Sequence, residues 1–164
     1  TTSTTMALAL GDALCCTVLN YRKFDKSSFS KFHPGGKLGK NLKTLEDIMS
    51  KDLPFVNINE TISEAILVMT EKKYGCVVIC NNRNIIQGII TDGDLRRSFK
   101  KDIKNLNSLK IKDMMNSKPV TVKKNILVTT AINLMNKRSI TSLIISENKK
   151  PIGIVNLKEC TLSV

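Results

Sequence analysis

Two polar residues at the end of an apolar run have the spacing to start a helix or to hold a phosphorylated ligand. Thr91 and Asp94 follow the run Ile85–Ile90, and Gly93 lies between them. The β-branched run predicts a buried strand, and Thr91 three residues before Asp94 predicts a capping box at the start of a helix. Because a helix N-terminus presents free amide groups, the same corner could bind an anion. These residues alone leave both interpretations open.

A single histidine is the second candidate for chemistry. His33 begins the run His-Pro-Gly-Gly-Lys-Leu-Gly, whose proline and glycines predict a tight loop without regular structure. Histidine titrates near neutral pH and can act as a general acid or base. From the local residues, the default interpretation is a surface histidine or a hydrogen-bonded structural one.

The cysteines predict no metal site. Cys76 and Cys80 fall in an apolar run that predicts a strand, where four residues span about 13 Å, too far to share a metal ion. The other three are Cys15, Cys16 and Cys160, and no Cys-x-x-Cys spacing occurs. The odd number, without a recognisable secretory signal, predicts buried free thiols in a reducing cytoplasm.

The formal net charge of +12 raises the question of a nucleic-acid partner. Lysine is scattered over every segment, however, and the sequence has no basic helix face, zinc-finger spacing or aromatic RNA-binding signature. We therefore expect no nucleic-acid partner, whereas anionic small ligands remain compatible with the charge. With 41% hydrophobic residues, the chain has enough apolar material for a core.

The N-terminal segment Met6–Leu19 has the length of a helix and is apolar on nearly every side. Such a helix is normally buried in a larger protein or in a membrane. A segment of about 14 residues is shorter than the roughly 20 that span a bilayer, and Asp12 lies in its middle, so we predict no membrane span. We expect its packing partners upstream of Thr1, as in a C-terminal portion of a larger protein.

From residue 46 the chain repeats itself. The four apolar residues Ile62, Ala65, Ile66 and Met69 recur 66 positions later as Val128, Ala131, Ile132 and Met135. Each set lies on one face of a helix and is followed by a strand, a polar turn and a strand-to-helix corner. The second corner carries Asn156 and Glu159 in place of Thr91 and Asp94. We predict an α+β fold of two βαββα repeats with pseudo-twofold symmetry and a cleft between them.

The repeat, with Gly-apolar-apolar-Thr-x-x-Asp at residues 88–94, resembles the cystathionine-β-synthase (CBS) domain. Together with the runs at 1–5, 11–14, 33–39 and 91–97, it resembles the arabinose-5-phosphate isomerase family, which joins a sugar isomerase (SIS) domain to a tandem CBS pair. The resemblance implies that residues 1–45 are the last helix and His-Pro-Gly-Gly loop of a SIS-type α/β domain. Residues 46–103 and 110–164 would be the two CBS domains.

The resemblance also implies a reaction for the parent protein. That family interconverts D-ribulose 5-phosphate and D-arabinose 5-phosphate without a catalytic cofactor, in the synthesis of Kdo, an acidic sugar of lipopolysaccharide. His33 matches the family's proposed catalytic histidine. The SIS core is missing from this sequence, so we expect the 164-residue chain alone to be inactive.

In CBS domains of this pattern, the corner threonine contacts phosphate and the aspartate contacts ribose hydroxyls, roles that match Thr91 and Asp94. Gly93 permits close backbone approach, and Asn156 with Glu159 would form a poorer second site. The implied ligand is an adenine or cytidine nucleotide, or the nucleotide sugar CMP-Kdo. The resemblance further implies a homo-oligomer, with dimers of CBS pairs and a tetrameric parent. The alternatives are a stand-alone CBS-pair nucleotide sensor and a purely structural oligomerisation module, in which Thr91 and Asp94 only cap a helix.

Overall fold

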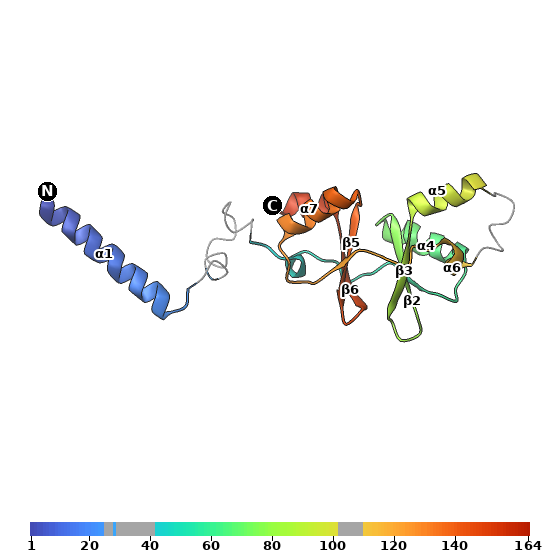
Figure 1. Cartoon of the computed structure of the whole chain (residues 1–164), viewed down its shortest axis with the longest axis horizontal. Coiled ribbons are helices and arrows are strands. Elements are labelled where there is room, and N and C mark those ends of the chain that lie inside the picture. The colour runs from blue at the N-terminus through green and yellow to red at the C-terminus, as the bar shows by residue number, and fades with distance from the viewer. Residues whose placement is uncertain (25–27, 29–41, 102–109) are drawn as a thin grey trace. The chain divides into compact units, whose positions relative to one another are not determined.

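The computed structural model describes residues 1–24, 28, 42–101 and 110–164 (Figure 1). The chain divides into two compact units, residues 1–42 and 43–164. His33 and the rest of the His-Pro-Gly-Gly loop lie outside the described residues.

The first unit contains helix α1 (Thr2–Tyr21). At 20 residues it is longer than the segment predicted from sequence, because the helix begins directly after Thr1 rather than at Met6. The length argument against a membrane span was therefore wrong: α1 is long and apolar enough to cross a membrane by length and composition. The core helix of a soluble protein meets the same criterion, so the absence of a membrane partner stays a prediction.

The second unit contains two copies of the predicted order strand, helix, strand, strand, helix. The first copy is β1 (Phe55–Asn57), α4 (Ile62–Lys72), β2 (Cys76–Cys80), β3 (Ile86–Thr91) and α5 (Asp92–Lys101). The second copy is β4 (Thr121–Val122), α7 (Val128–Arg138), β5 (Ser142–Glu147), β6 (Lys150–Asn156) and α8 (Leu157–Ser163). A short helix precedes each copy: the 3₁₀ helix η1 (Leu45–Asp47) and α6 (Ile111–Met114). The predicted α+β repeat is confirmed.

Each copy forms its own three-stranded sheet, in the orders β1-β2-β3 and β4-β5-β6. In both sheets the first strand is parallel to the second, and the second pairs with the third in antiparallel fashion. The antiparallel pairs are irregular at matching places, after Ile79 and after Ile145. The two repeats therefore share their register as well as their order of elements.

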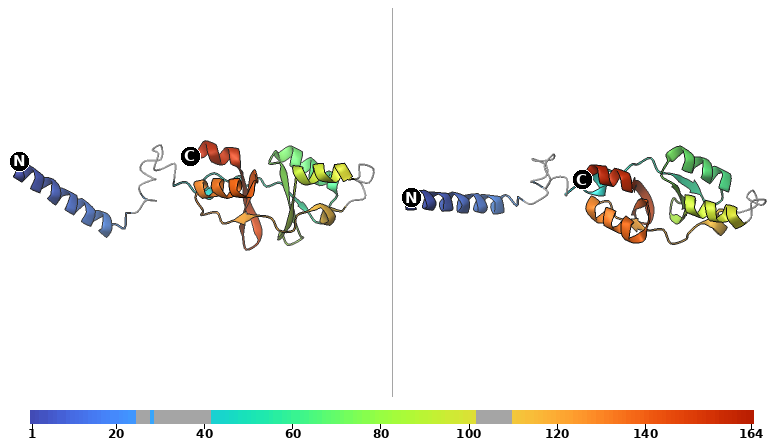
Figure 2. Two further views of the ribbon diagram at one scale, coloured as in Figure 1. Left: turned by 45° about the horizontal axis from the view of Figure 1, so that its top comes forward. Right: turned by 90° about the horizontal axis from the view of Figure 1, so that it is seen from above.

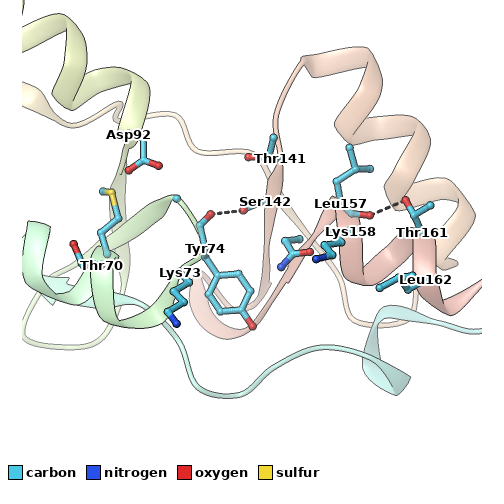
Figure 3. Close-up of a pocket in the computed structure, with 13 residues that line it drawn as sticks. Thr70, Lys73, Tyr74, Asp92, Thr141, Ser142, Leu157, Lys158, Thr161 and Leu162 are labelled. Atoms are coloured by element: carbon cyan, nitrogen blue, oxygen red, sulfur yellow. Dashed lines mark hydrogen bonds between the residues drawn. The ribbon is translucent and has the colours of Figure 1, made fainter.

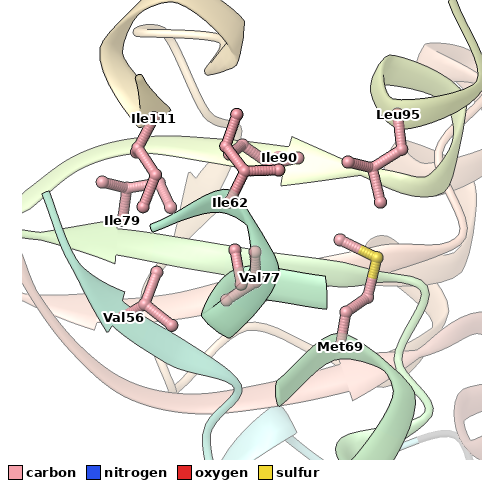
Figure 4. Close-up of a cluster of buried hydrophobic side chains, with 9 residues drawn as sticks. Val56, Ile62, Met69, Val77, Ile79, Ile90, Leu95 and Ile111 are labelled. Atoms are coloured by element: carbon pink, nitrogen blue, oxygen red, sulfur yellow. The ribbon is translucent and has the colours of Figure 1, made fainter. Parts of the chain in front are cut away.

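The central strand of each sheet is buried on both faces. On β2, Val77 and Ile79 point into a cluster with residues of α4 (Figure 4), whereas Val78 and Cys80 belong to another cluster that includes Ile144 of the second sheet. Successive side chains of a strand point to opposite faces, so one strand supplies both clusters. Within this unit the sheets meet through the shared cluster, and each sheet carries its helices on the other face (Figure 2).

The segment before each repeat packs into the core of the other repeat. Leu45 of η1 is buried in the cluster formed by the second repeat, and Ser50 pairs with Ile154 on β6. Conversely, Ile111 of α6 is buried in the first repeat's cluster, and Asn116 pairs with Ile89 on β3. The packing thus interleaves the two repeats, and the domain boundaries predicted from sequence stay a prediction.

The cysteines differ in their surroundings. Cys76, Cys80 and Cys160 are buried and free, as predicted, and burial raises the pKa of each of these thiols to about 11. Cys15 and Cys16 on α1 are exposed, so the prediction of burial was wrong for them in the unit described. No group of three or more potential metal ligands occurs among the described residues.

Gly88 lets the segment at Met115 and Asn116, which precedes the second repeat and packs onto the first, approach β3 closely. We call it the exchanged segment. A Cβ atom at this position would lie 2.8 Å from the carbonyl oxygen of Asn116 and 2.8 Å from Sδ of Met115. We expect Gly88→Ala to destabilise the protein by about 1–3 kcal/mol, because the crowded carbonyl belongs to paired backbone and cannot move freely. The urea midpoint, followed by circular dichroism, measures this loss.

Gly11→Ala is the matched control, since a Cβ there meets nothing within 4 Å. It should leave the unfolding of the second unit unchanged. Equal midpoints for Gly88→Ala and wild type would contradict the tight fit of the exchanged segment.

Candidate functional site

The corner between β3 and α5 forms the predicted capping box. The backbone amide and the hydroxyl of Thr91 both donate to Oδ2 of Asp94, at 2.9 and 2.6 Å, and the Asp94 amide reaches the Thr91 hydroxyl at 3.3 Å. Helix capping therefore uses one carboxylate oxygen of Asp94. The other oxygen, Oδ1, accepts a hydrogen bond from Arg97 at 2.6 Å.

Asp94 is held in its charged form by these contacts. Burial alone would raise the pKa of its carboxyl group, but hydrogen bonds from Thr91 and Arg97 outweigh burial and hold the pKa below its usual range. Arg97 is 71% exposed and Asp94 only 20%. The arginine is thus a mobile partner of a fixed carboxylate, because its long side chain lies mostly in solvent.

A cavity of about 470 Å³ opens at this corner, and we call it the first cavity. Thr91 and Asp94 line it, with Gly93 between them. The remaining lining residues come from both repeats and include the cations Arg96, Arg97 and Lys118 and the segment Ser139–Ser142. The predicted cleft between the repeats is confirmed here, and it combines hydrogen-bonding groups with cations.

The corner between β6 and α8 forms a second capping box. The Asn156 amide donates to Oε2 of Glu159 at 2.9 Å, and the Glu159 amide donates to the side-chain oxygen of Asn156 at 2.8 Å. The other carboxylate oxygen, Oε1, lies 3.4 Å from the hydroxyl of Tyr74, which belongs to the first repeat. The two corners are alike as helix caps and differ in what covers the remaining oxygen.

A larger cavity of about 860 Å³ lies beside this second corner, and we call it the second cavity. Asn156, Leu157 and Lys158 line it from one side, and Lys73 and Tyr74 from the other. Figure 3 shows the Tyr74 ring extending from the end of α4 toward the second repeat. Its backbone carbonyl accepts a hydrogen bond from the Ser142 hydroxyl at 2.7 Å.

The repeat and its paired corners match a known family. The family description "CBS domain" matches residues 45–101 and 111–162, which together cover more than half of the chain. The chain belongs to the CBS-domain family. The tandem CBS pair predicted from the residues is therefore confirmed.

Curated relatives confirm the resemblance to arabinose-5-phosphate isomerases. Arabinose 5-phosphate isomerase KdsD of Yersinia pestis is 41% identical over 162 residues, which cover 97% of this chain and 49% of that protein. The protein of the same name from Escherichia coli K12 is 37% identical over the same length, again with 97% and 49% coverage. The chain thus spans about half the length of the curated relatives it matches.

Solved CBS-domain structures share the fold of the second unit. A CBS-domain protein of Agrobacterium tumefaciens has a TM-score of 0.67 at 18% identity, covering 74% of this chain and 93% of that chain. CBSX2, solved in complex with AMP, has a TM-score of 0.61 at 21% identity, covering 73% and 93%. The CBS pair of MJ0100, solved with 5′-methylthioadenosine and S-adenosyl-L-methionine, has a TM-score of 0.65 at 20% identity, covering 74% and 94%.

The structure brings together the predicted residues of each corner and adds two that sequence reasoning missed, Lys118 and Tyr74, together with the pairing of Arg97 with Asp94. Arg97 follows Asp94 by three residues on one helix, so its pairing could have been predicted from spacing. Tyr74 reaches the second cavity from the first repeat, and Lys118 reaches the first cavity from the segment before β4; no local pattern marks either residue. The catalytic assignment of His33 lies outside the described residues.

The depressed pKa of Asp94 makes stability depend on pH in acid. A carboxyl group whose pKa is lower folded than unfolded stabilises the protein fully above its unfolded pKa, about 3.9, and loses that contribution as pH falls through the folded pKa. We expect wild type to be more stable than Asp94→Asn at pH 7, with the difference shrinking below about pH 4. Urea unfolding at pH 7 and pH 3 measures both differences.

Thr91→Val is the companion variant, because it removes the hydroxyl that donates to Asp94. In this background the Asp94→Asn substitution should show a weaker dependence on pH. A stability difference between wild type and Asp94→Asn that stays constant from pH 7 to pH 3 would contradict the assignment.

Proposed function

We propose that this chain is the regulatory CBS pair of an arabinose 5-phosphate isomerase and binds a nucleotide or nucleotide sugar in the first cavity. The observation that carries the proposal is the arrangement of that cavity, where a half-buried carboxylate and a helix N-terminus lie beside three cations. The similarity to arabinose 5-phosphate isomerases over 97% of the chain supports the identity of the parent protein.

The first cavity has separate places for the sugar and the phosphate of a nucleotide. Oδ1 of Asp94 accepts hydrogen bonds from two vicinal hydroxyls when Arg97 moves away. The released guanidinium then pairs with phosphate, together with Arg96 and Lys118. The Thr91 hydroxyl, turned from Oδ2 of Asp94 toward the ligand, and the Gly93 amide at the start of α5 supply neutral donors to the same phosphate.

Adenine nucleotides are the first ligands to test. Related CBS folds have been solved with AMP and with 5′-methylthioadenosine and S-adenosyl-L-methionine, all of which contain adenosine. Cytidine nucleotides and CMP-Kdo are the second group, because the resemblance implies a parent enzyme in Kdo synthesis. The sensed molecule would then be a product of the pathway that the enzyme supplies.

The parent enzyme would interconvert D-ribulose 5-phosphate and D-arabinose 5-phosphate in the cytoplasm, with His33 as an acid–base residue. Moving a proton between C1 and C2 of a sugar phosphate needs such a group. We assign residues 1–45 to the end of its SIS domain, and 46–103 and 110–164 to the two CBS domains. The parent would be a tetramer in which CBS pairs form dimers.

A purely structural module is the second candidate. Two observations favour it: both corner carboxylates already serve helix caps, and the apolar side chains of Leu67 and Leu162 are exposed. Such a module would stiffen an oligomer and bind no nucleotide.

Nucleotide binding separates the two candidates. We expect AMP at about 100 times its dissociation constant to raise the free energy of unfolding by roughly 2.7 kcal/mol, visible as a higher melting temperature. ATP, CMP and CMP-Kdo complete the panel. Asp94→Ala should abolish the shift, because it removes the acceptor for the ribose hydroxyls.

Asp47→Ala is the matched control. It removes the carboxylate of another capping box, formed with Thr44 outside both cavities. This variant should keep the full nucleotide shift. No shift with any of the four nucleotides would favour the structural module, as would a shift that Asp94→Ala leaves intact.

The catalytic part of the proposal has its own test. We expect the purified 164-residue chain to convert D-ribulose 5-phosphate no faster than buffer, because most of the chain belongs to the CBS domains, whereas the resemblance assigns the chemistry to a SIS domain. A coupled assay for D-arabinose 5-phosphate measures the rate. A protein-dependent rate that disappears in His33→Ala would show that the chain is catalytic by itself.

A further inference from the structure

The two cavities differ in one respect that their sequence motifs do not explain. Asp94 lines the first cavity, whereas Glu159, its counterpart, is not among the described residues that line the second. Both carboxylates accept a hydrogen bond from the backbone amide of their N-cap residue, and Asp94 also accepts one from the Thr91 hydroxyl. The remaining oxygen of Glu159 has a partner from outside its corner.

Tyr74 is the residue that covers Glu159. Its hydroxyl lies 3.4 Å from Oε1 of Glu159, at the long end for an O–H···O contact, and its backbone carbonyl is held by Ser142 at 2.7 Å. Both partners belong to the second repeat, so Tyr74 is fixed across the cleft at its backbone and at its phenol. Burial raises the pKa of the phenol, as does the Glu159 carboxylate, while a hydrogen bond with Ser50 opposes them.

Among the described residues that line the first cavity, none is a counterpart to this phenol. Helices α4 and α7 both end at a residue in the left-handed conformation, Lys73 with φ 58° and Ser139 with φ 52°. The next residue is Tyr74 in the first repeat and Ile140 in the second, and each lines the cavity opposite its own corner. The Ile140 side chain offers no hydrogen bond, and within the part of the chain that the structure describes, Oδ1 of Asp94 has the exposed Arg97 of its own helix as its partner.

We propose that Tyr74 occupies the ligand position of the second corner, so that the CBS pair binds nucleotide at the first corner alone. This inference rests on the proposed nucleotide function and adds its stoichiometry. A ribose that reaches Glu159 must displace the phenol and break a contact that joins the two repeats. A ribose that reaches Asp94 displaces only a solvent-exposed arginine, which keeps a partner in the ligand's phosphate.

Exchanging the residue that covers Glu159 tests the proposal. Tyr74→Ile gives the second cavity an isoleucine like Ile140 of the first cavity. Isothermal titration calorimetry with AMP then counts the binding sites per chain. We expect Tyr74→Ile to gain one site per chain over wild type. The affinity at this second corner should rise at least about tenfold, because the ligand no longer competes with the hydrogen bond of the phenol. Adding Glu159→Ala to this variant should remove the gained site.

Two further variants serve as controls for Tyr74→Ile. Tyr21→Ile replaces the other tyrosine, which is 89% exposed on α1, and should leave the number of sites unchanged. Tyr74→Phe removes only the hydroxyl and should also gain the second site, which guards against a folding defect in Tyr74→Ile. Thermal unfolding confirms that each variant is folded.

The outcomes separate this inference from the proposed function. A gained site that depends on Glu159 supports the role of Tyr74, whether wild type binds AMP once or not at all. No gain in either Tyr74→Ile or Tyr74→Phe overturns it, as does a gained site that survives Glu159→Ala. The first site, measured in wild type and lost in Asp94→Ala, bears on the proposed nucleotide function alone.

Discussion

The exchange of short segments between the two repeats is the constraint on which the second unit depends. Leu45 fills the core of the second repeat and Ile111 that of the first, so neither core is complete without a segment that precedes the other repeat. Two domains of about 55 residues would be marginal alone, and the exchange makes them fold as one unit. It also fixes the two sheets against each other, and both cavities are lined from both repeats as a result.

The carboxylate at each corner makes two kinds of contact. One oxygen completes the capping box of its helix, which fixes the carboxylate in place, and the other is left for a partner outside the box. Two similar capping boxes can therefore have carboxylates with different partners outside the box. At Asp94 the outside partner is a solvent-exposed arginine, whereas at Glu159 it is a phenol from the opposite repeat. The chemical asymmetry between Thr91–Asp94 and Asn156–Glu159 is therefore reinforced by what lies across the cleft.

Local patterns predicted the fold well, and long-range contacts account for what they missed. The spacing of Thr91 and Asp94 predicts the capping box because all its atoms lie within one turn. The 66-residue repeat predicts the order of elements, but it cannot say which core a short apolar segment such as Leu45 fills. The contact of Tyr74 with Glu159 joins residues 85 positions apart and leaves no periodic signal. The start of α1 was placed too late, at Met6, because the polar residues before Met6 belong to the helix.

A crystal structure of this chain with AMP shows both corners at once and so decides whether the CBS pair binds nucleotide at the first corner alone. We predict AMP in the first cavity, with its ribose hydroxyls on Asp94 and with Arg97 turned from that carboxylate toward the phosphate. At the second corner, the Tyr74 hydroxyl should still face Glu159. AMP seated against Glu159 with Tyr74 displaced, or a first cavity left empty at saturating AMP, would contradict binding at the first corner alone.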